Sequence, residues 1–256
     1  MSRATLSTAA FFGATGDCAG YCLANALKAG HRCVALARTP AKLTASMKAK
    51  DVPEAALTNL TIIQGDVRDQ KAVESALRIN GVVVDTIISS VGSVPALRWS
   101  LTSPVSVVDA TLCGDAAKVL VSALRSLKPA KKPVVVVVST TGLKRNNLPR
   151  DVPLAYVPLY HWLLHVPHID KANMEKAVRD ASAEPAGPLE RFVAIKPTLL
   201  MDGPSRGSGK LRVGTDEKPA LGYAIRRSEV GQWIYENVIA QEVKPAYIGK
   251  GISLTA

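Results

Sequence analysis

The sequence predicts an α/β protein in which a doubly wound, mostly parallel sheet carries helices on both faces. Short β-branched apolar runs alternate with longer amphipathic runs along the 256 residues, which is the pattern of strands joined by crossover helices. The run VVVVV at 134–138 has no polar alternation, so both of its faces are expected to be buried inside the sheet. Glycines at 13 and 16 follow the first apolar run and precede a helical pattern, which is typical of the first turn of such folds.

Seven apolar runs give the expected strands, and six amphipathic patterns give the expected helices. The strands are expected at 9–14, 33–37, 60–64, 85–89, 134–138, 192–196 and 246–249, and the helices at about 17–29, 40–49, 69–79, 104–127, 168–182 and 228–240. Several helices carry Lys or Arg in their last turn, where the helix dipole favours positive charge. The glycine- and proline-rich stretch 202–222 is expected to be a long surface loop.

The formal charge of +11 raises the question of nucleic-acid binding. The basic residues are scattered, and their densest groups, at 128–132, 144–150 and 205–212, are not interleaved with aromatic residues. We therefore expect no nucleic-acid partner, because such binding needs a basic stripe or patch. A positive field that attracts a phosphorylated small molecule explains the charge more simply.

The sequence also indicates where the protein resides. No apolar stretch approaches the ~20 residues that span a bilayer, and the first residues do not match a signal peptide. The four cysteines include no C-x-x-C pair. We expect reduced thiols, a cytoplasmic location and no membrane partner.

The first turn, in FFGATGDCAG, is the strongest motif of the chain. Gly13 and Gly16 allow the backbone to approach a pyrophosphate, whose charge is stabilised by the free N–H groups at the start of the following helix. We expect cofactor contacts from the whole turn, that is Gly13, Ala14, Thr15, Gly16, Asp17 and Cys18.

The end of the second strand indicates which dinucleotide binds. Enzymes that use NAD place an acidic residue there for the ribose 2′-hydroxyl, whereas a basic residue suits a 2′-phosphate. The residue here is Arg38, followed by Thr39 and by Lys42 in the next helix. We therefore predict NADP(H) as the cofactor in preference to NAD(H); a solvated basic corner is the alternative interpretation.

Two further strand ends offer cofactor contacts. After the third strand, Asp66 and Val67 can meet an adenine through a hydrogen bond and an apolar contact. After the fourth strand comes SSVGS, in which Gly92 permits a close backbone pass along the ribose. The residues expected there are Ser89, Ser90, Val91 and Gly92.

Taken in order and spacing, GATGDCAG, ALAR, GDVRD, SSVGS, STTG and IKPTLLMDG resemble the atypical short-chain dehydrogenase/reductase family, in particular its NmrA-like, NAD(P)-binding branch. The resemblance covers essentially the whole chain and departs at Ala19, where the family has a third glycine. It implies one Rossmann-type domain over 1–256, with a small substrate-covering portion at about 144–168 and 198–228. It also implies that Pro197, Thr198 and Leu199 line the nicotinamide carboxamide.

The family's catalytic positions are only partly filled. The resemblance implies hydroxyl groups after the fifth strand, at Ser139 and Thr140, and a lysine on the next helix, Lys171. The family's tyrosine would stand four positions earlier, where this chain has Pro167. His168, on the same helical face as Lys171, is the first candidate for a replacement proton donor, and Tyr160 and Tyr156 follow. His168 as a positioning or pocket residue is the alternative.

The stretch 159–178 holds three of the four histidines, which invites a metal interpretation. His161 and His165 have a chelating i, i+4 spacing, but the interval lacks the acid of a zinc-protease helix and offers no third ligand. We expect no metal site. A short amphipathic lid, with Tyr160, Trp162 and Leu163 facing a substrate, is the preferred interpretation.

Three functions follow from these residues and the resemblance. The first is an NADP(H)-dependent oxidoreductase acting on a small, largely apolar carbonyl, alkene or alcohol, for which secondary metabolism is one setting. The second is a dinucleotide-sensing regulatory protein without catalysis, and the third is a redox-neutral isomerase, cyclase or lyase on the same fold. We expect a small-molecule substrate and a monomer or homodimer.

Overall fold

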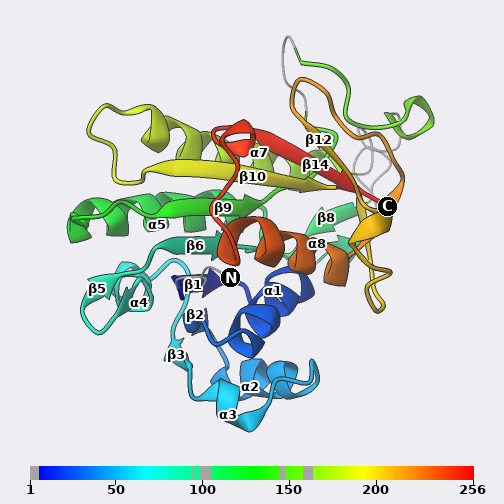
Figure 1. Cartoon of the computed structure of the whole chain (residues 1–256). Coiled ribbons are helices and arrows are strands. Elements are labelled where there is room, and N and C mark those ends of the chain that lie inside the picture. Colours follow the sequence, from blue (N-terminus) through cyan, green and yellow to red (C-terminus); the bar gives the residue numbers. More distant parts are fainter. Residues whose placement is uncertain (1–5, 94, 98–104, 144–147, 158–163) are drawn as a thin grey trace.

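The computed structural model describes residues 6–93, 95–97, 105–143, 148–157 and 164–256 (Figure 1). Eight strands form one sheet in the order β12-β14-β10-β9-β6-β1-β2-β3. Every neighbouring pair is parallel except β12 with β14. The strands are β1 (Thr8–Phe12), β2 (Arg32–Ala37), β3 (Leu60–Gln64), β6 (Thr86–Ser89), β9 (Val134–Val138), β10 (Arg191–Pro197), β12 (Arg212–Thr215) and β14 (Gly251–Thr255).

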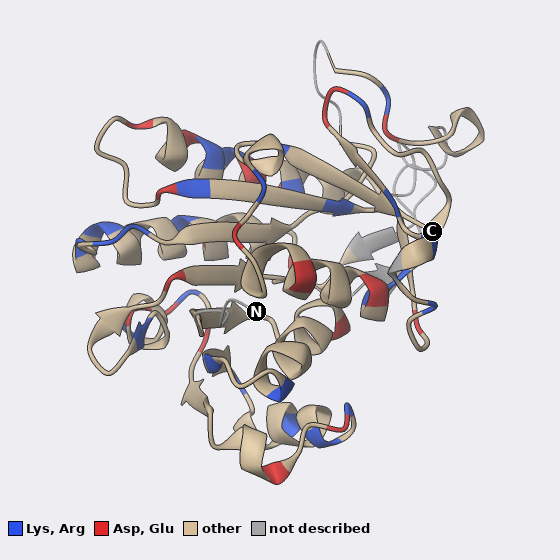
Figure 2. Cartoon of the chain, in the orientation of Figure 1, with Lys and Arg blue, Asp and Glu red and all other residues tan. Residues whose placement is uncertain are grey.

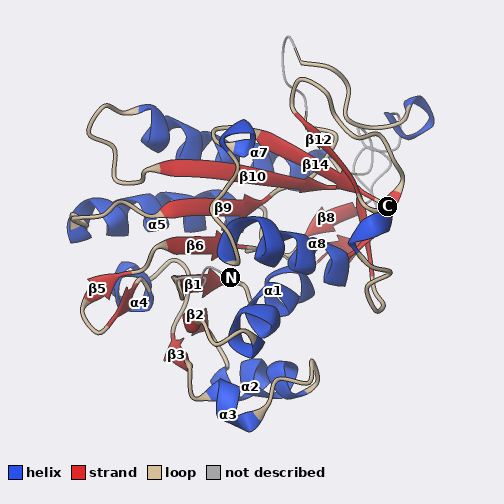
Figure 3. Ribbon diagram, viewed as in Figure 1, coloured by secondary structure: helices blue, strands red, loops and turns tan. Residues whose placement is uncertain are grey.

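Helices cover both faces of this sheet (Figure 3). One buried apolar cluster joins the sheet to the helices α1 (Asp17–Lys28), α2 (Pro40–Lys48) and α8 (Arg227–Ile234). A second cluster joins the other face to the helices α4 (Gln70–Ala76), α5 (Leu112–Leu127) and α7 (His165–Ala183). The predicted fold class, a doubly wound parallel sheet with helices on both faces, is confirmed.

The valines of β9 show why this strand lies inside the sheet. Val136 and Val138 belong to the cluster under α1 and α8, whereas Val135 and Val137 belong to the cluster under α5 and α7. All four are buried. The absence of polar alternation in the sequence is therefore explained by burial of both faces.

The remaining elements are short. They are α3 (Glu54–Leu57), β4 (Arg78–Ile79), β5 (Val82–Val83), β7 (Pro95–Leu97), β8 (Val105–Val107), η1 (Leu154–Tyr156), β11 (Leu199–Met201), η2 (Ser208–Lys210), β13 (Ala224–Arg226), η3 (Tyr235–Ile239) and η4 (Pro245–Tyr247). In the described part of the chain no helix has both the length and the apolar character needed to cross a membrane. Basic and acidic residues are interspersed over the elements (Figure 2).

Three expectations about elements were wrong. The last strand is β14, not 246–249, where Pro245 opens a 3-10 turn and Gly249 has a φ of 74° that turns the chain before the strand begins. The helix expected from 104 begins only at Leu112, because 105–107 pairs with 95–97 as a small hairpin. The loop expected at 202–222 contains β12, which extends the sheet along β14.

The strand order reverses between β1 and β6, which are neighbours although four named strands separate them in the chain. Open α/β sheets bind ligands beyond the carboxyl ends of their strands at such a point. The turn after β1 and the loops after β6 and β9 therefore border the expected crevice.

Candidate cofactor and substrate site

The turn after β1 has the shape of an anion cradle. Gly13 has a φ of 80°, and a Cβ atom there would lie 2.6 Å from the main-chain oxygen of Ser90, so only glycine fits. The N–H of Gly16 donates to the oxygen of Gly13 at 3.0 Å, and α1 begins at Asp17. The N-cap of α1 is Gly16, which has no side chain that could accept hydrogen bonds from the first turn. N–H groups of this turn are therefore available to an anion. These residues fit a pyrophosphate.

The other members of this turn differ in exposure. Thr15 and Gly16 are exposed, whereas the side chains of Ala14 and Cys18 are buried. Burial raises the pKa of the Cys18 thiol to about 12, although the charges of Arg227 and Lys171 act in the opposite direction. Cys18 can therefore meet a cofactor only through its main chain, and both cations lie within electrostatic reach of the turn.

The carboxylate of Asp17 stands close to the expected phosphate position, which by itself would repel an anion. Its Oδ1 lies 2.8 Å from Nζ of Lys50, whose side chain is almost buried and also stacks over the ring of Tyr21. This ion pair offsets the negative charge at the start of α1, where the helix dipole then favours an anion.

The end of β2 is basic and open. Arg38, Thr39 and Lys42 are all exposed, and α2 begins at Pro40 with no side-chain bond from its N-cap, Thr39. Arg38 makes no ion pair within the described part of the chain. A guanidinium without a carboxylate partner at this edge is suited to a phosphate, which it can bind through two parallel hydrogen bonds.

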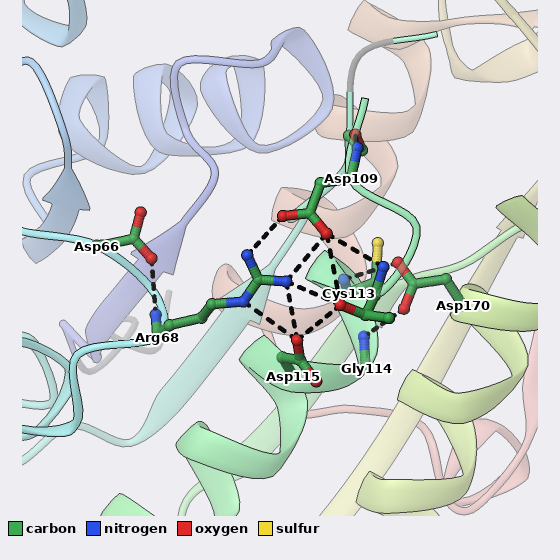
Figure 4. A network of polar contacts seen from close by, with 9 residues as sticks. Asp66, Arg68, Asp109, Cys113, Gly114, Asp115 and Asp170 are labelled. Atoms are coloured by element: carbon green, nitrogen blue, oxygen red, sulfur yellow. Dashed lines mark hydrogen bonds and ion pairs between the residues drawn. The ribbon is translucent and has the colours of Figure 1, made fainter. Parts of the chain in front are cut away.

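The adenine side of the expected site is built around a residue that the sequence reasoning missed, Arg68. Its guanidinium contacts both carboxylate oxygens of Asp109, Oδ2 of Asp115 at 2.8 Å and the hydroxyl of Thr111 (Figure 4). Hydrogen bonds from Arg68 lower the pKa of Asp109 to about 2. This network ties the GDVRD loop to the start of α5, next to the exposed Asp66 and half-buried Val67. The arginine inside the GDVRD motif was the signal that could have found it.

The loop after β6 lies directly against the glycine turn. Ser89 and Val91 are buried, Ser90 is half-buried and Gly92 is exposed. The N–H of Ser90 donates to the oxygen of Phe12 at 2.9 Å. The structure therefore brings the predicted ribose-side residues together with the turn after β1.

Lys171 joins the ends of two strands. Its Nζ donates to the main-chain oxygen of Val91 at 2.9 Å and to that of Val138 at 2.8 Å. The preceding residue, Asp170, is buried and accepts hydrogen bonds from the N–H groups of Cys113 and Gly114, both at 2.8 Å (Figure 4). Asp170 thus caps α5 from a different helix, and this pair of contacts fixes the position of α7.

The hydroxyl candidates after β9 differ in their partners. Ser139 is buried, and its Oγ donates to Oε1 of Glu175 at 2.6 Å. Thr140 is half-buried, and its hydroxyl donates to the oxygen of Thr141. Glu175 was not predicted, although it follows Lys171 by four positions and shares its helical face.

The proposed proton donors lie at the start of α7 or before it. His168 is half-buried in the first turn of α7, one residue after Pro167. Tyr160, Trp162 and Leu163, and with them the expected lid, lie outside the described residues, as does His161. Tyr156 is described and packs against Tyr223, with ring centroids 5.1 Å apart. No group of three or more metal-ligating side chains occurs among the residues that the structure describes.

The residues at and after the end of β10 differ in burial. Pro197 and Thr198 are buried, and Thr198 Oγ1 lies 3.2 Å from the hydroxyl of Thr255. Leu199 and Met201, in contrast, are each 52% exposed. Of these four residues, only Leu199 and Met201 expose apolar side chains.

A cavity of about 270 Å³ lies beside these strand ends, beneath the segment that follows β9. Its walls are mostly apolar, while Arg150, Asp151, Lys196 and Asp216 contribute charged groups. Its volume is slightly below the usual range for ligand pockets.

A doubly wound sheet with a glycine cradle at its switch point, together with a lysine joining the ends of β6 and β9, defines a dinucleotide-binding protein. The chain belongs to an NAD(P)H-binding oxidoreductase family, since the family model described as NAD(P)H-binding matches residues 13–240. The predicted membership of an NAD(P)-binding family is thereby confirmed.

Two curated relatives match over nearly their whole length. The reductase pytE from Aspergillus terreus is 38% identical, with 97% of each chain covered. The oxidase pynE from Aspergillus niger is 34% identical, covering 93% of this chain and 94% of the relative. Among solved structures, a short-chain dehydrogenase/reductase from Veillonella parvula in complex with NADP has a TM-score of 0.68 at 13% identity, with coverages of 98% and 95%. That likeness concerns the fold alone.

Proposed function

We propose that this protein is an NADP(H)-dependent oxidoreductase that acts on a small, largely apolar carbonyl, alkene or alcohol. The observation that carries the proposal is the position of Lys171, whose ammonium group lies at the ends of β6 and β9 beside the glycine cradle. A lysine at this place can hold the hydroxyl groups of a nicotinamide ribose. The two curated relatives, named a reductase and an oxidase, support a redox reaction.

The chain offers a group for each part of the cofactor. The free N–H groups after Gly13 fit the pyrophosphate, Arg38 and Lys42 fit the 2′-phosphate, and the exposed Leu199 lies where an apolar ring can pack. When bound, the nicotinamide supplies the hydride. The protein then has to orient the substrate, exclude water and deliver a proton.

The source of that proton is proposed to be His168, which lies three positions before Lys171 on the same helix. Pro167 carries no hydroxyl group and cannot take the role of a tyrosine. Ser139 and Thr140 are proposed to accept or donate hydrogen bonds at the substrate oxygen, with Ser139 held in place by Glu175. We further propose that 148–157 and 198–228 cover the substrate.

The test is NADPH oxidation by purified protein with a panel of aldehydes, ketones and enones, followed by the loss of NADPH absorbance. We expect saturable oxidation with at least one substrate class and a weaker response with NADH. Tight NADPH binding with no oxidation across the panel would contradict catalysis.

A second candidate function is a dinucleotide sensor without catalysis, and the observation that favours it is Pro167 in place of the family's tyrosine. In that case NADPH binds but is not consumed. Conversion of a substrate without NADPH would instead favour a redox-neutral enzyme.

A further inference from the structure

The helices α1 and α8 lie side by side (Figure 1). Gly231 of α8 is a contact point, because a Cβ atom there would lie 2.5 Å from the main-chain oxygen of Cys18 in the first turn of α1. Farther along, Asn25 of α1 and Tyr235, which follows α8, line one shared surface depression. The two helices therefore run in the same direction. Arg227, the first residue of α8, precedes Gly231 by about one turn and lies beside the start of α1.

The charge of Arg227 acts on the first turn of α1. Burial raises the pKa of the Cys18 thiol, and the charge of Arg227 is the first to oppose this rise, followed by that of Lys171. Lys171 already donates to two main-chain oxygens, and Lys50 is paired with Asp17. Because Asp17 is the only acidic residue of α1 and already has this partner, the charge of Arg227 is not neutralised from this helix.

The ion pair that Arg227 makes is open to solvent. Its Nη1 lies 2.5 Å from Oδ1 of Asp202, whose side chain is 83% exposed. Asp202 follows β11 and Arg227 follows β13, and these two strands pair in parallel, so both residues lie at the same edge. An exposed ion pair adds little to stability because water competes for both charges. Arg227 can therefore exchange this carboxylate for a stronger anion.

Two neighbouring arginines have structural contacts instead. Arg206 pairs with the buried carboxylate of Glu229, and Arg226 donates to the main-chain oxygen of Pro204. These contacts hold the loop after β11 on the start of α8. The segments outside the described residues contain no Asp or Glu, so they supply no second carboxylate for Arg227. Of the three arginines, Arg227 is the one whose partner is exposed and replaceable.

We propose that Arg227 binds the pyrophosphate of the dinucleotide and that Asp202 competes with this anion for its guanidinium. A guanidinium can hold two phosphate oxygens through parallel hydrogen bonds, in addition to the N–H groups at the start of α1. The inference rests on the proposed function only in placing a dinucleotide at the glycine turn.

The variant Arg227→Met keeps most of the length of the side chain and removes its charge. We expect the Kd values of NADPH and NADH to rise together, by ~10-fold or more, because both dinucleotides carry the pyrophosphate. Nicotinamide fluorescence titration at fixed salt measures both constants. Arg227→Lys keeps a positive charge and should lose less affinity than Arg227→Met. Unchanged constants in Arg227→Met, or a change for NADPH alone, would overturn the proposal.

The variant Asp202→Asn should change affinity in the opposite direction, which a purely structural ion pair would not do. Without the competing carboxylate, both Kd values should fall by ~2- to 5-fold. The same substitution in the Arg227→Met background should have no effect, because no guanidinium is left to be released. An equal gain in both backgrounds would show a general effect of charge and would overturn the competition.

Arg125 and Glu184 form the matched control pair. Both are exposed, with Nη2 of Arg125 2.6 Å from Oε1 of Glu184. Arg125 lies in the last turn of α5, whereas the first turn of that helix contacts the loop after β6. Arg125→Met and Glu184→Gln should leave both constants unchanged.

Two further outcomes separate this inference from the proposed function. If Arg227→Met does not fold, Arg227→Lys and Asp202→Asn still decide, because each keeps the ability to form hydrogen bonds at its position. A protein that binds neither dinucleotide before any substitution would refute the proposed function together with this inference. Dinucleotide binding that survives Arg227→Met unchanged would refute this inference alone.

Discussion

Replacing Arg38 by alanine tests which dinucleotide the protein prefers. Arg38 follows β2 directly, is exposed and has no ion-pair partner among the described residues. Its guanidinium is therefore free to bind a 2′-phosphate without first breaking another contact. The variant removes this group and leaves the buried part of β2, which ends at Ala37, unchanged.

The expected magnitude follows from the kind of contact that is lost. Hydrogen bonds between charged groups contribute roughly 1.5–3 kcal/mol, and the exposed position of Arg38 places this contact toward the lower part of that range because water and salt screen it. We therefore expect the Kd for NADPH to rise ~10- to 30-fold. The Kd for NADH, which has no 2′-phosphate, should change by less than about two-fold.

Fluorescence titration of both dinucleotides at fixed salt measures these constants. Arg32→Ala is the matched control, because Arg32 is an exposed arginine at the other end of the same strand and should leave both constants unchanged. An equal Kd for NADPH in Arg38→Ala and in the unchanged protein would refute the assignment of Arg38 to the 2′-phosphate. Loss of NADH affinity by the same factor would indicate a general disturbance of the site instead.

Three further predictions concern the cradle, the lysine and a buried carboxylate. Gly13→Ala should lower the free energy of unfolding by about 2 kcal/mol or more in urea titrations, because its Cβ would meet main-chain Ser90; Gly209→Ala, with open space around it, should not. Lys171→Met should reduce kcat/KM by ~100-fold or more with retained circular dichroism, and a fully active variant would contradict the nicotinamide position. Burial raises the pKa of Glu229, but hydrogen bonds from Arg206 and the main chain outweigh it and hold the pKa at about 2, below the ordinary 4.5. This depressed pKa gives stability that is present above pH 4.5 and lost as the pH falls toward 2, so Glu229→Gln should cost about 2 kcal/mol at neutral pH, and a difference that stays constant on acidification would refute the reasoning.

Most strands could be predicted because burial on both faces leaves a local signal. The apolar residues of β9 and β10 are consecutive in the sequence. Each run can therefore be recognised as a strand from the adjacent residues alone. β14 could not be predicted in this way, because it contains Ser253 and Thr255. Ser253 is tolerated in the core since it accepts the N–H of Ala220, which lies 33 positions away.

The candidate site shows the same difference between local sequence signals and contacts that join distant residues. The positions of Gly13 and Arg38 could be predicted because each directly follows a strand, whereas Lys171 was implied by the family resemblance. The bond between Ser139 and Glu175 joins residues 36 positions apart, and the ion pair of Lys196 and Asp216 joins residues 20 positions apart. Such pairings depend on the register of the sheet and on the docking of α7, which no local pattern encodes.

The adjacent residues Asp170 and Lys171 have a consequence for protein engineering. Asp170 holds the start of α5, on the proposed adenine side, and Lys171 joins the ends of β6 and β9, on the proposed side of the reaction. A graft that replaces the segment before α7 to accept a new substrate would shift both anchors at once. Under the proposed function, substrate scope and coenzyme affinity are therefore linked through these two residues, and a redesign of one has to be screened against the other.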